Sequence, residues 1–199
     1  RIRDMAEQLI RIAAEREIET LARVYPPEGV YEEFCARFPY EETEDQLQSI
    51  TDVFEDLSTG RPMDRLICGD VGFGKTEVAL RAAFIVAMQG MQVAVVVPTT
   101  LLARQHFNQF KDRFRNLPLK VRQLSRMVTG KEASEVRAAL ASGACDVVVG
   151  THALLAKTIS FSNLGLLVID EEQHFGVGQK ERLKELKTGV HVLTLTATP

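Results

Sequence analysis

The chain has 199 residues, of which 45% are hydrophobic, and a formal net charge of −3. This length suffices for one well-buried domain with a short appendage, and the small net charge by itself gives no sign of a nucleic-acid-binding protein. No apolar run reaches the ~18 residues that a membrane span needs, and the N-terminus lacks the apolar core of a signal peptide. The sequence therefore predicts a cytoplasmic protein that does not enter a membrane.

The N-terminal segment predicts one amphipathic helix over residues 1–24, because its apolar residues recur at helical spacing among charged ones. Pro26 and Pro27 end this helix, and we expect the polar segment that follows to be a linker or a short helix. The main domain is predicted to begin near Phe38, so that residues 1–37 form a connector and residues 38–199 the domain. Because the chain begins without a methionine and stops directly after a strand-like run, we expect it to be a fragment.

Short apolar runs alternate with helical patterns through the rest of the chain. In order, these predict a helix that ends at Gly60, a strand at 65–68, a helix at 75–88, a strand at 92–97, a helix at 100–115, a strand at 120–124, a helix at 131–142, strands at 146–149 and 166–169, a helix at 179–187 and a strand at 191–195. Alternation of this kind indicates a parallel sheet with helices on both faces. The expected fold class is α/β, a three-layer doubly wound parallel sheet with an N-terminal amphipathic helix.

A glycine-rich segment lies between the first predicted strand and the helix at 75–88. It consists of Gly69, Asp70, Val71, Gly72, Phe73, Gly74, Lys75 and Thr76, and it matches the phosphate-binding pattern G-x-x-x-x-G-K-S/T. Glycines let backbone N–H groups face phosphate oxygens, and the helix N-terminus adds its dipole. We expect Lys75 to reach the β- and γ-phosphates of a nucleotide and Thr76 to ligate Mg²⁺. A chance glycine turn is the alternative, which the strand–turn–helix setting disfavours.

A second apolar run, at 166–169, ends in the acids Asp170, Glu171 and Glu172. Ligands bind at the carboxyl ends of the strands in sheets of this class. Asp170 is placed to hold Mg²⁺ through water, and Glu171 to orient or deprotonate an attacking water. Consecutive acids after a strand can also form a solvated loop, but the phosphate-binding pattern upstream favours a catalytic site.

Three further segments carry a resemblance to the superfamily 2 helicases, whose motor domains have a RecA-like fold. The segment Asp170–His174 resembles their DExQ/DExH box, and Thr196–Pro199 resembles their TAT/SAT motif. Thr43–Gln46 resembles their Q motif, in which a glutamine amide reads the adenine edge. The resemblance implies that ATP is the nucleotide and that Phe38, Gln46 and the continuation of the glycine-rich segment to Glu77 belong to its site. Gln46 could instead be an ordinary first-turn helix residue behind a Thr43 cap.

Two motifs that follow strands resemble the helicase motifs that contact DNA, namely Pro98–Gln105 and Gly150–His152. Each opens a helix at the carboxyl edge of the sheet, where hydroxyls and free N–H groups can hold phosphates without reading sequence. The neighbouring stretch 101–126 carries 7 Lys and Arg against one acid, and is either a solvated face or a phosphate contact. Helix capping by the threonines is compatible with phosphate binding. The residues expected to contact DNA or to couple it to ATP are Thr99, Thr100, Arg104, Arg126, Thr151, His152, Gln173, Thr196 and Thr198.

A narrower resemblance is to the bacterial transcription-repair coupling factors and to the branch-migration helicase RecG. It is carried by GDVGFGKTEVA, VPTTLLARQH, VGTH and GLLVIDEEQHFG, and Phe73 with the Glu77–Ala79 continuation favours the coupling factors. The N-terminal helix also resembles the connector between their polymerase-binding and motor domains. Gln173-His174-Phe175 departs from the His/Gln-Arg-Phe pattern of this group, which leaves the role of His174 open.

The coupling-factor resemblance implies the first RecA-like domain of an ATP-dependent translocase on double-stranded DNA, which displaces stalled RNA polymerase and promotes nucleotide excision repair. The implied partners are double-stranded DNA, a second RecA-like domain of the same protein and, through other domains, RNA polymerase and excision-repair proteins. Because the second domain normally supplies the arginine finger, we expect the isolated chain to bind ATP weakly and to hydrolyse little of it. The alternatives are RecG-like fork reversal, a non-hydrolytic scaffold and a P-loop GTPase, although the chain contains no NKxD guanine reader.

Overall fold

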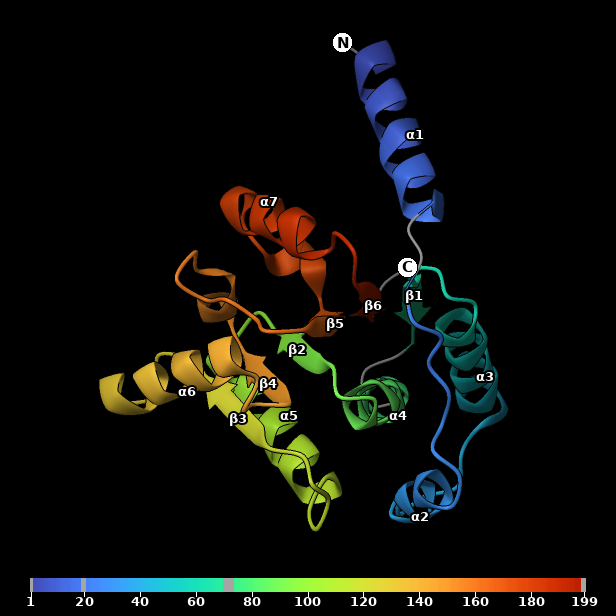
Figure 1. Cartoon of the computed structure of the whole chain (residues 1–199), viewed down its shortest axis with the longest axis vertical. Coiled ribbons are helices and arrows are strands. Elements are labelled where there is room, and N and C mark those ends of the chain that lie inside the picture. The colour runs from blue at the N-terminus through green and yellow to red at the C-terminus, as the bar shows by residue number, and fades with distance from the viewer. Residues whose placement is uncertain (1, 19–20, 70–73, 198–199) are drawn as a thin grey trace.

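The computed structural model describes residues 2–18, 21–69 and 74–197, whose strands form one parallel sheet (Figure 1). The strand order is β1-β6-β5-β2-β4-β3, and every neighbouring pair is parallel. The strands are β1 (Asp64–Cys68), β2 (Gln92–Val96), β3 (Val121–Leu124), β4 (Val147–Gly150), β5 (Leu164–Asp170) and β6 (His191–Thr196). All six carboxyl ends therefore point to one rim of the sheet.

Helices cover both faces of the sheet. Successive strand residues point to opposite faces, and because the residues of the central strands are apolar on both faces, each face packs against helices. In β2, Val93 and Val95 join a core with α3 (Glu44–Ser58), α4 (Lys75–Met88) and α5 (Thr100–Arg113). Ala94 and Val96 join a second core with α6 (Gly130–Ser142) and α7 (Val177–Leu186). Figure 1 shows α4 and α7 on opposite sides of the central strands. The three-layer doubly wound fold is confirmed, with element bounds close to those expected from the alternating pattern.

The N-terminal helix α1 (Ile2–Ile18) projects away from the sheet, and residues 2–14 are exposed (Figure 1). The prediction of a helix that continues to residue 24 is wrong for residues 21–24, which are not helical. Their backbone donors pair with the end of α3: the N–H of Leu21 donates to the Gly60 carbonyl (2.6 Å) and that of Val24 to the Leu57 carbonyl (3.0 Å). Those hydrogen bonds replace the helical ones.

The segment expected to be a linker or a short helix contains a helix, α2 (Val30–Ala36). Its Phe34 is buried and stacks on Phe84 of α4, with ring centroids 4.3 Å apart. The Arg37 guanidinium donates to the carbonyls of Arg113 (2.9 Å) and Arg115 (2.7 Å). Part of the predicted connector therefore packs into the core of the sheet domain, while the domain boundary near Phe38 stays a prediction.

Two short 3₁₀ helices lie at the rim: η1 (His152–Leu155) follows β4, where the motif Gly150–His152 was expected to open a helix, and η2 (Glu172–His174) follows β5 and was not anticipated. Segments of three or four residues are too short to show helical periodicity. Within the described ranges, no helix is long and apolar enough to cross a membrane.

Candidate nucleotide site and nucleic-acid interface

The carboxyl ends of β1, β6 and β5 bring the phosphate-binding segment next to the acidic box. These strands are neighbours, with Cys68 opposite Thr196 and Asp170 opposite Leu195. The N–H of Gly69 donates to the Thr196 carbonyl (3.1 Å), and that of Glu171 to the Leu195 carbonyl (2.9 Å). The sheet therefore brings together three motifs that are far apart in the sequence: the phosphate-binding segment, the acidic box and the motif at Thr196.

Two of the predicted catalytic side chains, Lys75 and Gln173, converge on Glu171 together with the predicted coupling residue Thr196. Its Oε1 lies 4.0 Å from the Lys75 ammonium and accepts a hydrogen bond from the Ala197 N–H (3.0 Å). Its Oε2 accepts from the Gln173 amide and lies 3.5 Å from the Thr196 hydroxyl. Its backbone is left-handed, with φ 52°, a conformation that costs a non-glycine residue about 1–2 kcal/mol. The surrounding contacts hold the carboxylate beside the lysine in spite of that cost.

Lys75 and Thr76 begin helix α4, whose N-cap is Gly74 in a left-handed conformation without a side-chain cap. The first N–H groups of such a helix are available to an anion. Hollows of about 520 and 560 Å³ border this helix start, and both include Gln46 and Lys75 in their walls. Their sizes are in the range of small-molecule sites. Phe38 and Thr76 line the larger hollow, as a nucleotide-binding role requires.

Gln46 takes part in a capping box at the start of α3. Its N–H donates to the Thr43 hydroxyl (3.1 Å), and its Oε1 accepts from the Thr43 N–H (2.8 Å). The side chain also lies over Gly74, where an added Cβ would overlap its amide nitrogen. The capping alternative is therefore observed, and the same side chain lies against the phosphate-binding segment. Recognition of adenine by Gln46 stays a prediction.

The Glu77 carboxylate is occupied by two arginines. It is 3% exposed, accepts from Arg81 Nε (2.9 Å) and receives both terminal nitrogens of Arg113, with Nη2 3.0 Å from Oε1. Burial alone would lower the pKa of Arg81, but hydrogen bonds to Glu42 and Glu77 raise that pKa above its ordinary value. Arg113 also lies over the Phe34 ring, 4.5 Å from its centroid. These contacts favour an anchoring role for Glu77 at the base of the nucleotide site.

Asp170 has a partner that the sequence analysis did not identify. The Nε2 atom of His106, on α5, lies 3.0 Å from Asp170 Oδ2, and both side chains are largely buried. His106 is the last residue of the segment VPTTLLARQH, so its position in a motif was the available signal. Only the tertiary structure shows that it faces the acidic box.

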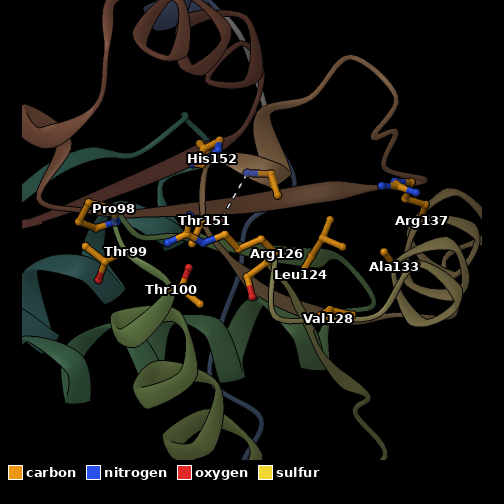
Figure 2. Close-up of a pocket in the computed structure, with 13 residues that line it drawn as sticks. Pro98, Thr99, Thr100, Leu124, Arg126, Val128, Ala133, Arg137, Thr151 and His152 are labelled. Atoms are coloured by element: carbon orange, nitrogen blue, oxygen red, sulfur yellow. Dashed lines mark hydrogen bonds between the residues drawn. The ribbon is translucent and has the colours of Figure 1, made fainter.

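A separate hollow of about 580 Å³ lies at the rim above β2, β4 and β3 (Figure 2). It gathers five residues predicted to contact DNA, namely Thr99, Thr100, Arg126, Thr151 and His152. Arg137 of α6 also lines it, which the sequence analysis missed because nothing marks one arginine on a solvated helix face. No acid is among the lining residues. Arg104 is exposed on α5 and does not line the hollow.

Three helices begin at this hollow, each behind a threonine. The Thr99 hydroxyl accepts from the Leu102 N–H (3.2 Å), and the Thr129 and Thr151 hydroxyls cap α6 and η1 in the same way. Figure 2 shows Arg126 crossing the hollow between Thr100 and His152. The threonines are thus helix caps, and the converging helix N-termini and two arginines make the hollow suitable for anions.

The remaining predicted residues, Asp70, Val71, Gly72, Phe73 and Thr198, lie outside the described residues.

A family model described as DEAD/DEAH box helicase matches residues 43–199. The chain belongs to the DEAD/DEAH box helicase family. The match includes the phosphate-binding segment, the acidic box and the motif at Thr196, so the resemblance to superfamily 2 helicases is confirmed.

Curated relatives of this helicase domain include transcription-repair-coupling factors of several bacteria. The whole chain is 57% identical over 203 residues to that of Rickettsia bellii (strain RML369-C), 52% over 198 residues to that of Bacillus subtilis (strain 168) and 48% over 199 residues to that of Escherichia coli (strain K12). It spans 18%, 17% and 17% of these relatives. The expected likeness to coupling factors is confirmed.

Solved structures show the same fold. The structure of RecG bound to a three-way DNA junction is similar over 95% of this chain and 25% of that chain, with 34% identity and a TM-score of 0.81. A hypothetical ATP-dependent RNA helicase from Sulfolobus tokodaii is similar over 87% of this chain and 51% of that chain, with 23% identity and a TM-score of 0.64. The second likeness shows the fold alone.

The oxygen ligands at the nucleotide edge are few. Asp170 offers one carboxylate and Thr76 one hydroxyl, and the described residues contain no group of three or more His, Cys, Asp or Glu suited to a metal ion. Mg²⁺ commonly binds through one or two carboxylates, retained waters and substrate phosphates. The donor set of this helicase domain fits that metal.

Proposed function

We propose that this chain is the ATP-binding half of a motor that translocates along double-stranded DNA, within a transcription-repair coupling factor that displaces stalled RNA polymerase and promotes excision repair. The observation that carries the proposal is the convergence of Lys75, Gln173 and Thr196 on Glu171. High identity to coupling factors along the whole chain supports the placement in that group. The location we propose is the bacterial cytoplasm.

In this proposal the γ-phosphate of ATP draws the Lys75 ammonium away from Glu171. The freed carboxylate then orients the attacking water, while Gln173 and Thr196 lose or change their contacts to it. Mg²⁺ bound near Thr76 and Asp170 would neutralise phosphate charge. The Ala197 N–H donates to the same carboxylate (3.0 Å). We propose that the segment at Ala197 faces a second RecA-like domain. A change in the contacts of Glu171 when the γ-phosphate binds or leaves would then be transmitted through Ala197 to that domain. That domain would supply an arginine finger.

The hollow lined by Arg126 and Arg137 is the proposed contact for the DNA backbone. Helix N-termini and arginines bind phosphates whatever the base sequence, as translocation along any DNA requires. A RecG-like fork-reversal enzyme is the second candidate, favoured by the 0.81 TM-score to RecG. Flanking domains would distinguish the two, since a polymerase-interaction domain supports the coupling factor and a wedge domain supports RecG.

The test is a DNA-dependent ATPase assay with the longer protein that contains this domain, using duplex and single-stranded DNA. We expect duplex DNA to stimulate hydrolysis more strongly than single strands. Lys75→Ala should lower the stimulated rate by about 100-fold or more, because a charge that stabilises the transition state is removed. Lys184→Ala, on the exposed face of α7, is the matched control and should have no effect. Unchanged duplex-stimulated hydrolysis in Lys75→Ala would overturn the proposal.

A further inference from the structure

Helix α5 runs between the two proposed sites. Its N-cap Thr99 and its first residue Thr100 line the hollow proposed for DNA. Its last residue, Arg113, donates two hydrogen bonds to the Glu77 carboxylate next to the nucleotide site. With 14 residues at about 1.5 Å each, the helix is about 20 Å long. His106 lies midway along it and makes the contact to Asp170.

The contact between His106 and Asp170 has a defined hydrogen-bond direction. The Nε2–Oδ2 distance is 3.0 Å, and the side chains are only 10% and 13% exposed. A carboxylate offers acceptors alone, so Nε2 must carry the hydrogen. The other ring nitrogen, Nδ1, is buried and has no hydrogen-bond partner among the described residues. The ring is therefore oriented by Asp170, and Asp170 by the ring.

We propose that His106 is a positioning residue, which holds the Asp170 carboxylate in the orientation that receives the Mg²⁺ of the bound nucleotide. This inference depends on the proposed function, since it deepens the same site. Hydrogen bonds from outside the coordination shell fix how a metal-binding carboxylate is rotated, and their loss commonly weakens metal affinity or activity 10–100-fold. His106 is suited to this role because its donor comes from a buried ring on a rigid helix rather than from a mobile surface chain.

A buried histidine could also serve only as packing between α5 and the sheet. Three variants of this chain separate the two roles. His106→Phe keeps a planar ring and removes the donor, whereas His106→Gln keeps an N–H donor of similar reach. Asn108→Ala is the control, since Asn108 is exposed on the same helix.

The first measurement is the affinity of each variant for a fluorescent ATP analogue, in EDTA and across a Mg²⁺ titration, together with thermal unfolding. We expect His106→Phe to need 10–100-fold more Mg²⁺ for half-maximal enhancement of binding, with unchanged affinity in EDTA. His106→Gln should recover most of the loss, and Asn108→Ala should resemble the unmodified chain. An unshifted Mg²⁺ midpoint in His106→Phe would overturn the proposal, as would an equal loss of affinity with and without Mg²⁺.

The second measurement needs neither metal nor nucleotide. Long-range proton–nitrogen NMR spectra of the His106 ring should show the hydrogen on Nε2, and Asp170→Ala should change that signal. A ring with its hydrogen on Nδ1 alone would refute the positioning role. If the unmodified chain shows no Mg²⁺-dependent nucleotide binding, the proposed function fails, whereas normal binding with an unaffected His106→Phe variant contradicts the His106 proposal alone.

Discussion

The nucleotide edge and the hollow around Arg126 occupy the same rim of the sheet, yet their side chains are held differently. At the nucleotide edge, Glu171 and Glu77 each contact at least two other side chains. In the hollow, threonine hydroxyls cap helices, and Arg126 and Arg137 form no ion pair among the described residues. The first region is a network of paired groups, and the second is an open set of donors.

This difference matches the two proposed tasks, which are chemistry on a phosphate at the nucleotide edge and contact with the DNA backbone in the hollow. Chemistry on a phosphate needs groups that are already positioned before the reaction, because reorganisation would raise the barrier. A contact with the DNA backbone needs available positive charge and donors, which exchange for counterions without a unique geometry. Substitutions should therefore affect stability strongly at the nucleotide edge and mainly binding in the hollow.

The largest effect is expected from Glu77→Ala. The change leaves Arg113 buried without its carboxylate, and Arg81 with Glu42 alone. Breaking a buried ion pair on one side costs about 3–5 kcal/mol, measured as the free energy of unfolding in urea. Asp112→Ala is the control, because Asp112 is 71% exposed and lies 3.9 Å from Arg115. A loss below about 1 kcal/mol in Glu77→Ala would mean that the network is not a stabilising anchor.

Gly150→Ala tests whether tight backbone packing beneath the hollow makes this region sensitive to substitution in its stability as well as in its binding. A Cβ at Gly150 would overlap the Leu124 carbonyl oxygen at the floor of the hollow, so we expect a loss of about 1–3 kcal/mol by thermal unfolding. At Gly178 in α7 an added Cβ meets no atom within 4 Å, and Gly178→Ala should gain about 0.5–1 kcal/mol. Equal stability of the two variants would contradict the close approach of β4 to the Leu124 carbonyl.

Arg126→Ala and Arg137→Ala should weaken duplex DNA binding while leaving stability unchanged. Each lost phosphate contact lowers the dependence of log K on log salt by about 1. Fluorescence anisotropy with a labelled duplex at several salt concentrations measures this slope, and Lys184→Ala is the control. Slopes equal to that of the unmodified chain would show that neither arginine contacts DNA.

The smallest effect is expected at Glu42, where the hydrogen bond from Arg81 lowers the pKa of the carboxyl below its ordinary value of 4.5. Because the folded-state pKa is the lower one, the stabilisation is fully present above pH 4.5 and is lost as pH falls through the folded-state value. Glu42→Gln should therefore cost less than about 1 kcal/mol at pH 7, and its difference from the unmodified chain should shrink in strong acid. Urea unfolding of both proteins at pH 7 and in strong acid measures this difference in the free energy of unfolding. A difference that grows in acid would contradict the predicted direction of the pH dependence.

Much of the fold was predictable because its signals are local. The alternation of apolar runs and helices identified the strands, and the phosphate-binding pattern placed Lys75 and Thr76 at a helix start. Residues 21–24 were predicted incorrectly because helical spacing continues to Leu21, while hydrogen bonds from distant carbonyls of α3 determine the conformation. The local sequence pattern does not show that hydrogen bonds to α3 will form in place of those of a continued helix.

The sequence by itself determined the α/β class and the order of elements, and it placed Lys75 and Thr76 at a helix start and Asp170 and Glu171 at the end of a strand, since periodicity and motif spacing are properties of neighbouring residues. Only the tertiary structure decided which of these residues meet. The order of the parallel strands places Glu171 between Lys75 and Thr196. The packing of α5 brings His106 to Asp170, and that of α6 adds Arg137 to the hollow. Those contacts depend on strand order and helix packing, which join segments many residues apart.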